Sequence, residues 1–120
     1  MPKTNNAQPY DLEERTFKFT QEVINFLKII PKKLANNEIA KQLIRSAGSV
    51  GANYIEANEA LSKKDFVMRA KICRKEAKES IYWLKLIEVY DSQGETERKG
   101  LIDEATQLLK IFSSIIEKTK

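Results

Sequence analysis

Apolar residues recur every three or four positions along most of the chain, the spacing that places side chains on one face of an α-helix. The pattern contains no convincing β-strand and predicts four helices, at about residues 11–30, 37–60, 63–91 and 96–118. Residues that start or stop helices mark the ends: the candidate caps Asp11, Asn36, Asn37 and Ser62, and the breakers Pro31 and Gly94.

The connections between these segments span only a few residues, and connections of that length join antiparallel neighbours. The chain is therefore expected to be all-α and to form an antiparallel four-helix bundle over residues 11–120. With 120 residues it is long enough for one domain with its own core. Residues 1–10 include two prolines and little that could pack, which predicts a flexible tail.

The third segment carries more apolar residues than one bundle core needs. One stripe follows a seven-residue repeat and is expected to face the core: Phe66, Ala70, Cys73, Ala77, Ser80, Leu84 and Ile87. A second stripe lies about a third of a turn away and contains the only tryptophan, Trp83. An exposed stripe of this size favours contact with another subunit.

Two glycines, Gly48 and Gly51, fall inside the second segment, where each costs about 1 kcal/mol relative to alanine. They indicate either a frayed or kinked helix or the close approach of another helix, for which a side chain would leave no room. Together with the apolar stripes they predict a surface for self-association, formed by Ile44, Gly48, Gly51, Ile55, Met68, Ile72 and Trp83.

The remaining third of the third segment is basic. A sector of about 120° on the helical wheel lacks acidic residues and contains Lys63, Lys64, Lys71, Arg74, Lys75, Lys78 and Lys85. Such a sector is usually a solvated outer face; the alternative is a stripe that contacts the phosphates of RNA or DNA. Tyr82 falls in the same sector, but its aromatic residues are too few to predict base stacking with confidence.

Polar residues also occur beside the apolar stripes and are expected to form a structural network, consisting of Arg45, Asn53, Glu56, Glu76 and Glu79. Carboxylates next to apolar surface can act as general acids or bases. A network in which Arg45 pairs with Glu76 or Glu79 explains them better, because such networks fix the register of neighbouring helices.

The chain has one cysteine and no histidine, which disfavours zinc and haem sites and removes the commonest general base near neutral pH. Cys73 lies in the core stripe and is expected to act as a small apolar residue. We therefore predict no catalytic residue, no metal site and no cofactor.

The balance of charge is mildly basic, with 21 Lys and Arg against 17 Asp and Glu. This excess permits nucleic acid or an acidic protein as a partner without requiring either. No run approaches the roughly 18 apolar residues that cross a membrane, and the first residues lack the pattern of a signal peptide. A cytoplasmic location without membrane contact is expected.

Three motifs resemble those of small four-helix-bundle proteins first noticed as products of intervening sequences in bacterial 23S ribosomal RNA genes. The pattern Arg-Ser-x-x-Ser-Val-x-Ala-Asn-x-x-Glu is matched by Arg45, Ser46, Ser49, Val50, Ala52, Asn53 and Glu56. A helix start of the form Ser-x-x-Asp-Phe is matched by Ser62, Asp65 and Phe66. The pattern Lys-Glu-Ala-x-Glu-x-x-Tyr-Trp-Leu is matched by Lys75, Glu76, Ala77, Glu79, Tyr82, Trp83 and Leu84.

The resemblance implies an up-down-up-down bundle that assembles into a homopentamer and belongs to a family without an established enzymatic activity. A similar bundle is the accessory protein of diversity-generating retroelements, which binds nucleic acid and a reverse transcriptase. Because a shared fold does not carry function by itself, two hypotheses follow. The first is a non-enzymatic oligomer that binds RNA or DNA through the basic sector; the alternative is a protein-interaction scaffold without nucleic-acid binding.

Overall fold

Caps and apolar faces define four helices in the computed structural model, which describes residues 11–120. The helices are α1 (Leu12–Leu27), α2 (Leu34–Asn58), α3 (Lys63–Leu86) and α4 (Ser92–Thr119). Asp11 caps α1 and Ser62 caps α3, as predicted, because each side chain accepts a hydrogen bond from the backbone N–H three residues further on.

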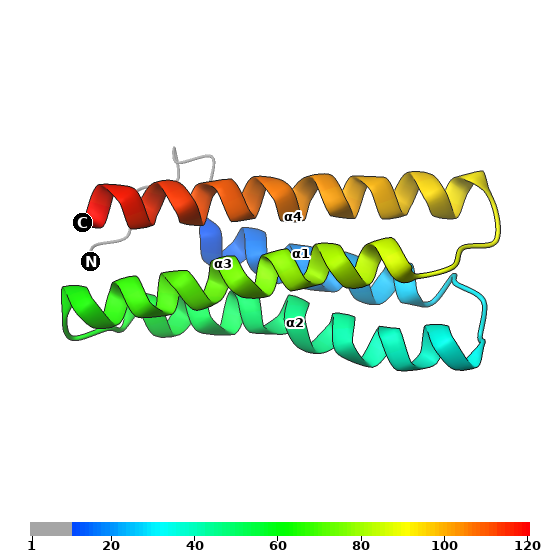
Figure 1. Cartoon of the computed structure of the whole chain (residues 1–120), viewed down its shortest axis with the longest axis horizontal. Helices are drawn as coiled ribbons and strands as arrows, with labels where there is room; N and C mark the ends of the chain where they lie inside the picture. Colours follow the sequence, from blue (N-terminus) through cyan, green and yellow to red (C-terminus); the bar gives the residue numbers. More distant parts are fainter. Residues whose placement is uncertain (1–10) are drawn as a thin grey trace.

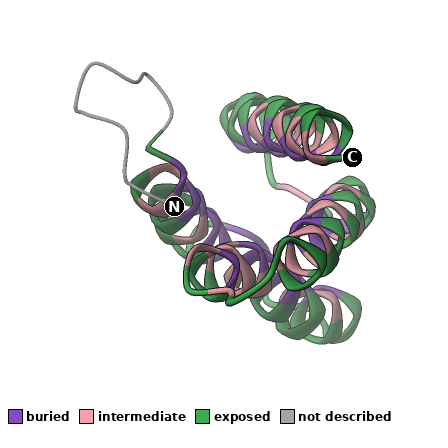
Figure 2. Cartoon of the chain, turned by 90° about the vertical axis from the view of Figure 1, so that its left-hand side faces the viewer, coloured by how far each residue is buried: buried purple, intermediate pink, exposed green. Residues whose placement is uncertain are grey.

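Each helix packs against the next, and α1 closes the bundle against α4. The helices alternate in direction, so the start of α3 and the end of α4 lie at the same end of the molecule (Figure 1). An end-on view shows the buried faces of the helices turned toward the interior of the bundle (Figure 2). The fold is therefore the predicted all-α, antiparallel four-helix bundle.

The core is built from the apolar face of every helix. The core stripe predicted for α3 is buried from Ala70 to Ile87, and Phe66 at its start is half-buried. The largest side chains with almost no exposure are Phe19, Phe26, Leu43, Leu84, Ile87, Leu108 and Phe112. Burial of a side chain of this size stabilises the fold by about 1.5–3 kcal/mol, so this interior accounts for most of the cohesion between the helices.

The predicted caps of α2 are wrong. The helix begins at Leu34, not at residue 37, and its cap position, Lys33, makes no side-chain capping bond. Asn36 is buried instead: its amide nitrogen donates to the carbonyls of Pro31 (3.0 Å) and Glu88 (2.9 Å), and its oxygen accepts from the Glu88 N–H (3.0 Å). Asn36 thus fastens the start of α2 to the connection that follows α3.

The helix ends also differ from those predicted. α1 stops at Leu27 rather than near residue 30, because the residue before Pro31 is disfavoured in helical conformation. α3 stops at Leu86 rather than 91, because the buried Ile87 is extended. α4 begins at Ser92 rather than 96, and its cap is Asp91, which accepts from the N–H of Gly94 (3.0 Å).

Gly94 therefore belongs to the first turn of α4. A Cβ there would lie 2.9 Å from Cβ of Val89, so only glycine fits. The two glycines of α2 behave differently from one another. A Cβ on Gly51 would lie 3.0 Å from Oγ1 of Thr16 on α1, whereas one on Gly48 would meet nothing within 4 Å. The close approach of another helix, expected at these positions, is thus found at Gly51, and the approaching helix is α1 of the same chain.

Candidate nucleic-acid interface

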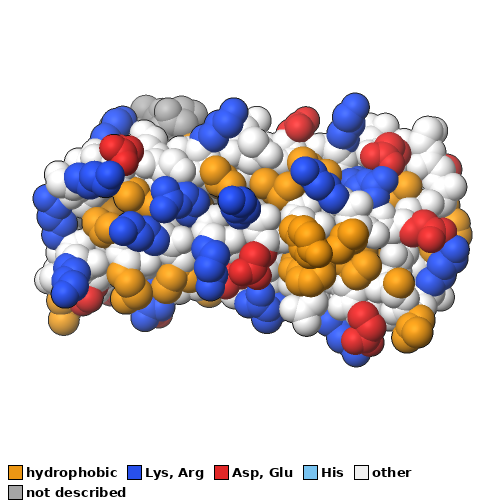
Figure 3. All heavy atoms as spheres, viewed as in Figure 1, with side chains coloured by type: hydrophobic (Ala, Val, Ile, Leu, Met, Phe, Trp, Pro, Cys, Tyr) orange, Lys and Arg blue, Asp and Glu red, His pale blue; other side chains and the backbone are white. Residues whose placement is uncertain are grey.

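The basic side chains predicted for α3 lie together on its outer side. We call Lys63, Lys64, Lys71, Arg74, Lys75 and Lys78 the basic face. Arg74 is half-buried and the other five are exposed. They occupy this side because the remaining sides of α3 pack on α2, on α4 and on the core. In a space-filling view, Lys and Arg side chains gather over the half of the molecule that holds the start of α3 and the end of α4 (Figure 3).

Few opposite charges neutralise the basic face. Within residues 11–120, Lys75 is its only member in an ion pair, with Glu76 at 3.7 Å. On α4, the pKa of Glu117 is lowered by a hydrogen bond from Lys120 and, further, by the charges of Lys120 and Arg74. Glu117 is thus already engaged by Lys120. Apart from that of Lys75, the ammonium groups of the basic face have no ion-pair partner among residues 11–120.

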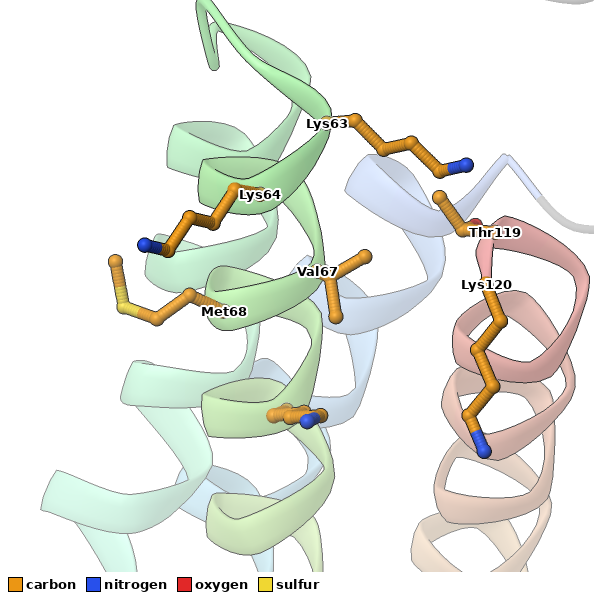
Figure 4. A pocket seen from close by; sticks show the side chains of 7 residues that line it. Lys63, Lys64, Val67, Met68, Thr119 and Lys120 are labelled. Carbon is orange, nitrogen blue, oxygen red and sulfur yellow. The ribbon is translucent and has the colours of Figure 1, made fainter.

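A hollow of about 610 Å³ opens where the start of α3 meets the end of α4, and it is lined by Lys63, Lys64, Val67, Met68, Lys71, Thr119 and Lys120. Lys63 extends toward α4, Val67 lies between the two helices, and Lys64 and Met68 lie on the far side of α3 (Figure 4). The hollow combines an apolar floor with a rim of ammonium groups. The sequence prediction missed its α4 residues, because they come near α3 only through the antiparallel fold.

Tyr82 continues the outer side of α3 beyond the basic face. Its side chain is 59% exposed, and its ring meets that of Trp83 edge-on, with centroids 4.9 Å apart and an interplanar angle of 73°. Leu86, one turn further on, is also exposed. Hydrophobic side chains form a patch over this half of the molecule, next to the basic half (Figure 3).

The predicted polar network lies on the opposite flank of α3, against α2. A guanidinium nitrogen of Arg45 is 3.0 Å from a carboxylate oxygen of Glu79 and 3.4 Å from one of Glu76, so Arg45 holds both carboxylates. Glu76 is almost completely buried, at 5% exposure. A buried carboxylate paired in this way can fix the register of the two helices.

Two further residues change the predicted membership of this network. Asn53 accepts a hydrogen bond from Arg69 (2.9 Å) and donates to the carbonyl of Ser49 (2.9 Å), so Arg69 is a member that the prediction missed. The side chain of Glu56 is exposed and makes no hydrogen bond or ion pair with any residue of the described range 11–120. The prediction placed Glu56 in the network because it lies one turn from Asn53, but its position on α2 turns outward.

Cys73 lies in the core, with no exposed surface, and its thiol donates to the carbonyl of Val50 on α2 (3.3 Å). Burial raises the pKa of this thiol to about 12. A thiol that stays protonated is a poor nucleophile and a poor metal ligand. In the part of the chain that the structure describes, no three His, Cys, Asp or Glu side chains are grouped as a metal site requires.

The residues predicted for self-association fall on two different surfaces. Ile44 and Ile55 are about half-exposed on α2, beside the open space at Gly48, and Gly51 of the same ridge is covered by α1. Phe17 and Ile24 of α1 extend this first surface, since both are exposed and Thr20 between them bonds to the carbonyl of Ala47 on α2. The prediction missed these two, although their seven-residue spacing is visible in the sequence.

The second surface lies on the α2 side of α3. Met68 is 46% exposed, while Ile72 and Trp83 are half-buried. The indole Nε1 of Trp83 is buried and has no hydrogen-bond partner among residues 11–120. The molecule therefore presents two distinct apolar surfaces on different helix pairs. None of the helices described in residues 11–120 is long and apolar enough to span a membrane.

Comparison with known proteins agrees with the motifs and the fold. The chain belongs to the family of 23S rRNA-intervening sequence proteins, whose pattern it matches over residues 9–114. It is also similar to a crystal structure of a protein of unknown function from the S23 ribosomal protein family of Bacteroides thetaiotaomicron. The two are 29% identical with a TM-score of 0.74, over 87% of this chain and 96% of that one. Among curated proteins none matches.

Proposed function

We propose that this family member is a non-enzymatic homo-oligomer that binds RNA or DNA through the basic face of α3. The observation that carries the proposal is that five of the six cations of that face form no ion pair with another residue in the described range 11–120. Unpaired surface cations can neutralise the phosphates of a nucleic acid and so displace the counterions condensed on them, and the release of these counterions drives binding. The expected ligand contact is therefore with the backbone and is largely independent of sequence.

The oligomer proposed here is a ring of five subunits. Support for association comes from the two apolar surfaces, one with Phe17 and Ile44, the other with Met68 and Trp83. Two different surfaces favour head-to-tail contacts, and such contacts close into a ring when the rotation between subunits permits. The number five comes from the resemblance of the motifs. A ring would repeat the basic face around its perimeter and strengthen weak contacts through avidity.

The test is fluorescence anisotropy with labelled RNA and DNA over a salt series. We expect log K to fall linearly with log[salt] and the triple variant Lys71→Glu, Arg74→Glu, Lys75→Glu to lose at least about 100-fold in affinity and to flatten the slope. Multi-angle light scattering gives the mass of both proteins and establishes that the variant still assembles. Absence of salt-sensitive binding by the wild type would refute the proposal.

A matched control separates the basic face from net charge. The variant Lys18→Glu, Lys28→Glu, Lys99→Glu carries the same change of charge on exposed residues of α1 and α4 and at the end of α1. We expect this variant to lose less than about tenfold, because counterion release depends on the phosphates contacted. Equal losses in the two variants would mean that total charge, rather than the basic face, sets affinity.

The second candidate function is a protein-interaction scaffold, which the exposed Phe17 (63%) and Ile24 (41%) of α1 favour. In this case the basic face is a solvated surface. It predicts that the Phe17→Ser, Ile24→Ser variant loses a specific partner in a pull-down while keeping its oligomeric mass. Loss of the oligomer in that variant would assign the surface to self-association instead.

A further inference from the structure

We infer, on the premise of the proposed function, that the nucleic acid is bound as a single strand whose unpaired bases pack on Tyr82 and in the hollow at the start of α3. The basic face explains attraction to phosphates in any form of nucleic acid. It does not explain why apolar groups occur at both of its ends. Such apolar groups can contact unpaired bases, so they favour a single strand over a duplex as the ligand.

Tyr82 lies in line with the phosphate-contacting residues. The positions 71, 75, 78, 82 and 85 are separated by four and three residues, so their side chains lie on one face of α3. Along the helix axis, Lys78 is about 6 Å and Lys85 about 4.5 Å from Tyr82. A nucleotide whose base stacks on Tyr82 would therefore have ammonium groups on both sides for its phosphates.

The ring of Tyr82 is exposed to solvent and is also restrained by a neighbouring side chain. More than half of the side chain is exposed, at 59%, and the edge-on contact with Trp83 restrains the ring. Aromatic rings that are open on one face and braced on another are the usual platforms for bases in single-stranded ligands, because every base offers a face for stacking. Tyr82 alone suits one base, and it sits where the strand would leave the basic face.

The hollow has the same combination of groups at the other end. Val67 forms an apolar floor between α3 and α4 (Figure 4), and the ammonium groups of Lys63, Lys64 and Lys71 line the hollow without forming ion pairs within the described part of the chain. Lys120 at the α4 side is engaged by Glu117. A duplex presents phosphates and keeps its bases inside, so it can reach the rim alone. A single strand can place its phosphates at the ammonium groups of the rim and an unpaired base against the apolar floor.

The experiment compares a labelled single strand with a duplex that carries the same number of phosphates, at equal salt. We expect the single strand to bind at least about tenfold more tightly, and Tyr82→Ala to remove about tenfold of its affinity while changing duplex binding less than twofold. The salt slope should not change in Tyr82→Ala, because no phosphate contact is lost. Tyr82→Phe should keep wild-type affinity, since its ring remains.

Trp83 provides an independent signal, because it is the only tryptophan and touches Tyr82. Its fluorescence should change when the single strand binds and stay constant with the duplex. Tyr90→Ala is the matched control: Tyr90 is 70% exposed but lies beyond the end of α3, so its removal should leave affinity unchanged.

The possible results separate the inference from its premise. Binding of single strand and duplex with equal affinity, unaffected by Tyr82→Ala, overturns the inference and leaves a protein that binds nucleic acid through its basic face. A change of oligomeric mass in Tyr82→Ala would also overturn it, because Tyr82 would then contact another subunit. If neither ligand binds, the proposed function itself fails and the inference fails with it.

Discussion

Both flanks of α3 carry charged side chains, but among the described residues 11–120 most of the opposite charges that pair do so on the flank toward α2. There Arg45 holds Glu76 and Glu79, and Arg69 bonds to Asn53. On the outer flank the basic face has one ion pair among the described residues 11–120, between Lys75 and Glu76. The same helix thus has one flank whose charges are satisfied within the chain and one whose charges are not.

This difference separates structural charge from charge available to a ligand. A buried carboxylate such as Glu76 requires its partner, since an unpaired charge in the interior is strongly unfavourable. An exposed ammonium such as that of Lys71 is hydrated and requires none. Charged residues of similar density in the sequence therefore have opposite roles: those facing α2 hold the bundle in register, and those facing solvent can bind an anionic partner.

The largest expected effect comes from breaking the α2 flank. We expect Arg45→Met to lower the free energy of unfolding by about 2 kcal/mol, because Glu76 is left buried without its main partner. The loss stays below that of a fully buried pair, since the Arg45 side chain is 50% exposed. Urea denaturation at fixed protein concentration gives the value.

The matched change on the outer flank is Lys71→Met, which we expect to alter stability by no more than about 0.5 kcal/mol. Adding Glu76→Gln to Arg45→Met should recover part of the loss, because the uncompensated charge is then removed. Equal destabilisation by Arg45→Met and Lys71→Met would contradict the distinction between the two flanks.

The next effect in size is a decrease of the free energy of unfolding at alkaline pH. It comes from Cys73, which lies on the core side of α3, between the two flanks. Burial raises the pKa of this thiol from 9.0 to about 12 in the folded protein. Above pH 9 the unfolded chain ionises its thiol and the folded chain does not, so unfolding releases a proton. The contribution to stability is therefore complete below pH 9 and is lost as the pH rises toward 12, at about 1.4 kcal/mol per pH unit.

The measurement is the free energy of unfolding of the wild type and of Cys73→Ala between pH 9 and 10.5. Cys73→Ala should be less stable at pH 8 and should show a flatter alkaline decline, by about 1–2 kcal/mol over this interval. Other groups titrate in the same range, which is why the difference between the two proteins is the informative quantity. Parallel curves would show that the thiol is not buried as described.

The features of the two flanks of α3 that depend on local periodicity could be predicted from the sequence. The positions of Cys73 and Leu84 in the core and of Lys71 outside it follow from the helical period alone. The fold followed from the same period and from the short connections. Pairing between Arg45 and the two carboxylates was accessible as well, because their positions fall on facing sides of neighbouring antiparallel helices.

Features that depend on distant contacts were not predictable in the same way. Asn36 is of a residue type that often caps helices, but its side-chain amide forms hydrogen bonds with the backbone of Glu88, 52 residues further along the chain. The hollow requires the start of α3 and the end of α4 to meet, which only the assembled bundle brings about. Capping preferences and wheel positions are local, so they cannot distinguish Glu56, turned to solvent, from Asn53, turned to Arg69.

The smallest expected effect tests whether the unpaired charges of the outer flank repel one another. Lys78 lies three and four residues after Lys75 and Arg74, and like charges at this spacing destabilise a helix by about 0.2–0.5 kcal/mol per pair. We therefore expect Lys78→Gln to raise the melting temperature by roughly 2 °C at low salt, and the gain to vanish at high salt, where screening is complete.

Lys18→Gln on α1 is the contrasting control. Lys18 lies one turn from Glu14 and from Glu22, so its replacement should lower the melting temperature. A gain in both variants would mean that glutamine stabilises either helix for reasons unrelated to charge.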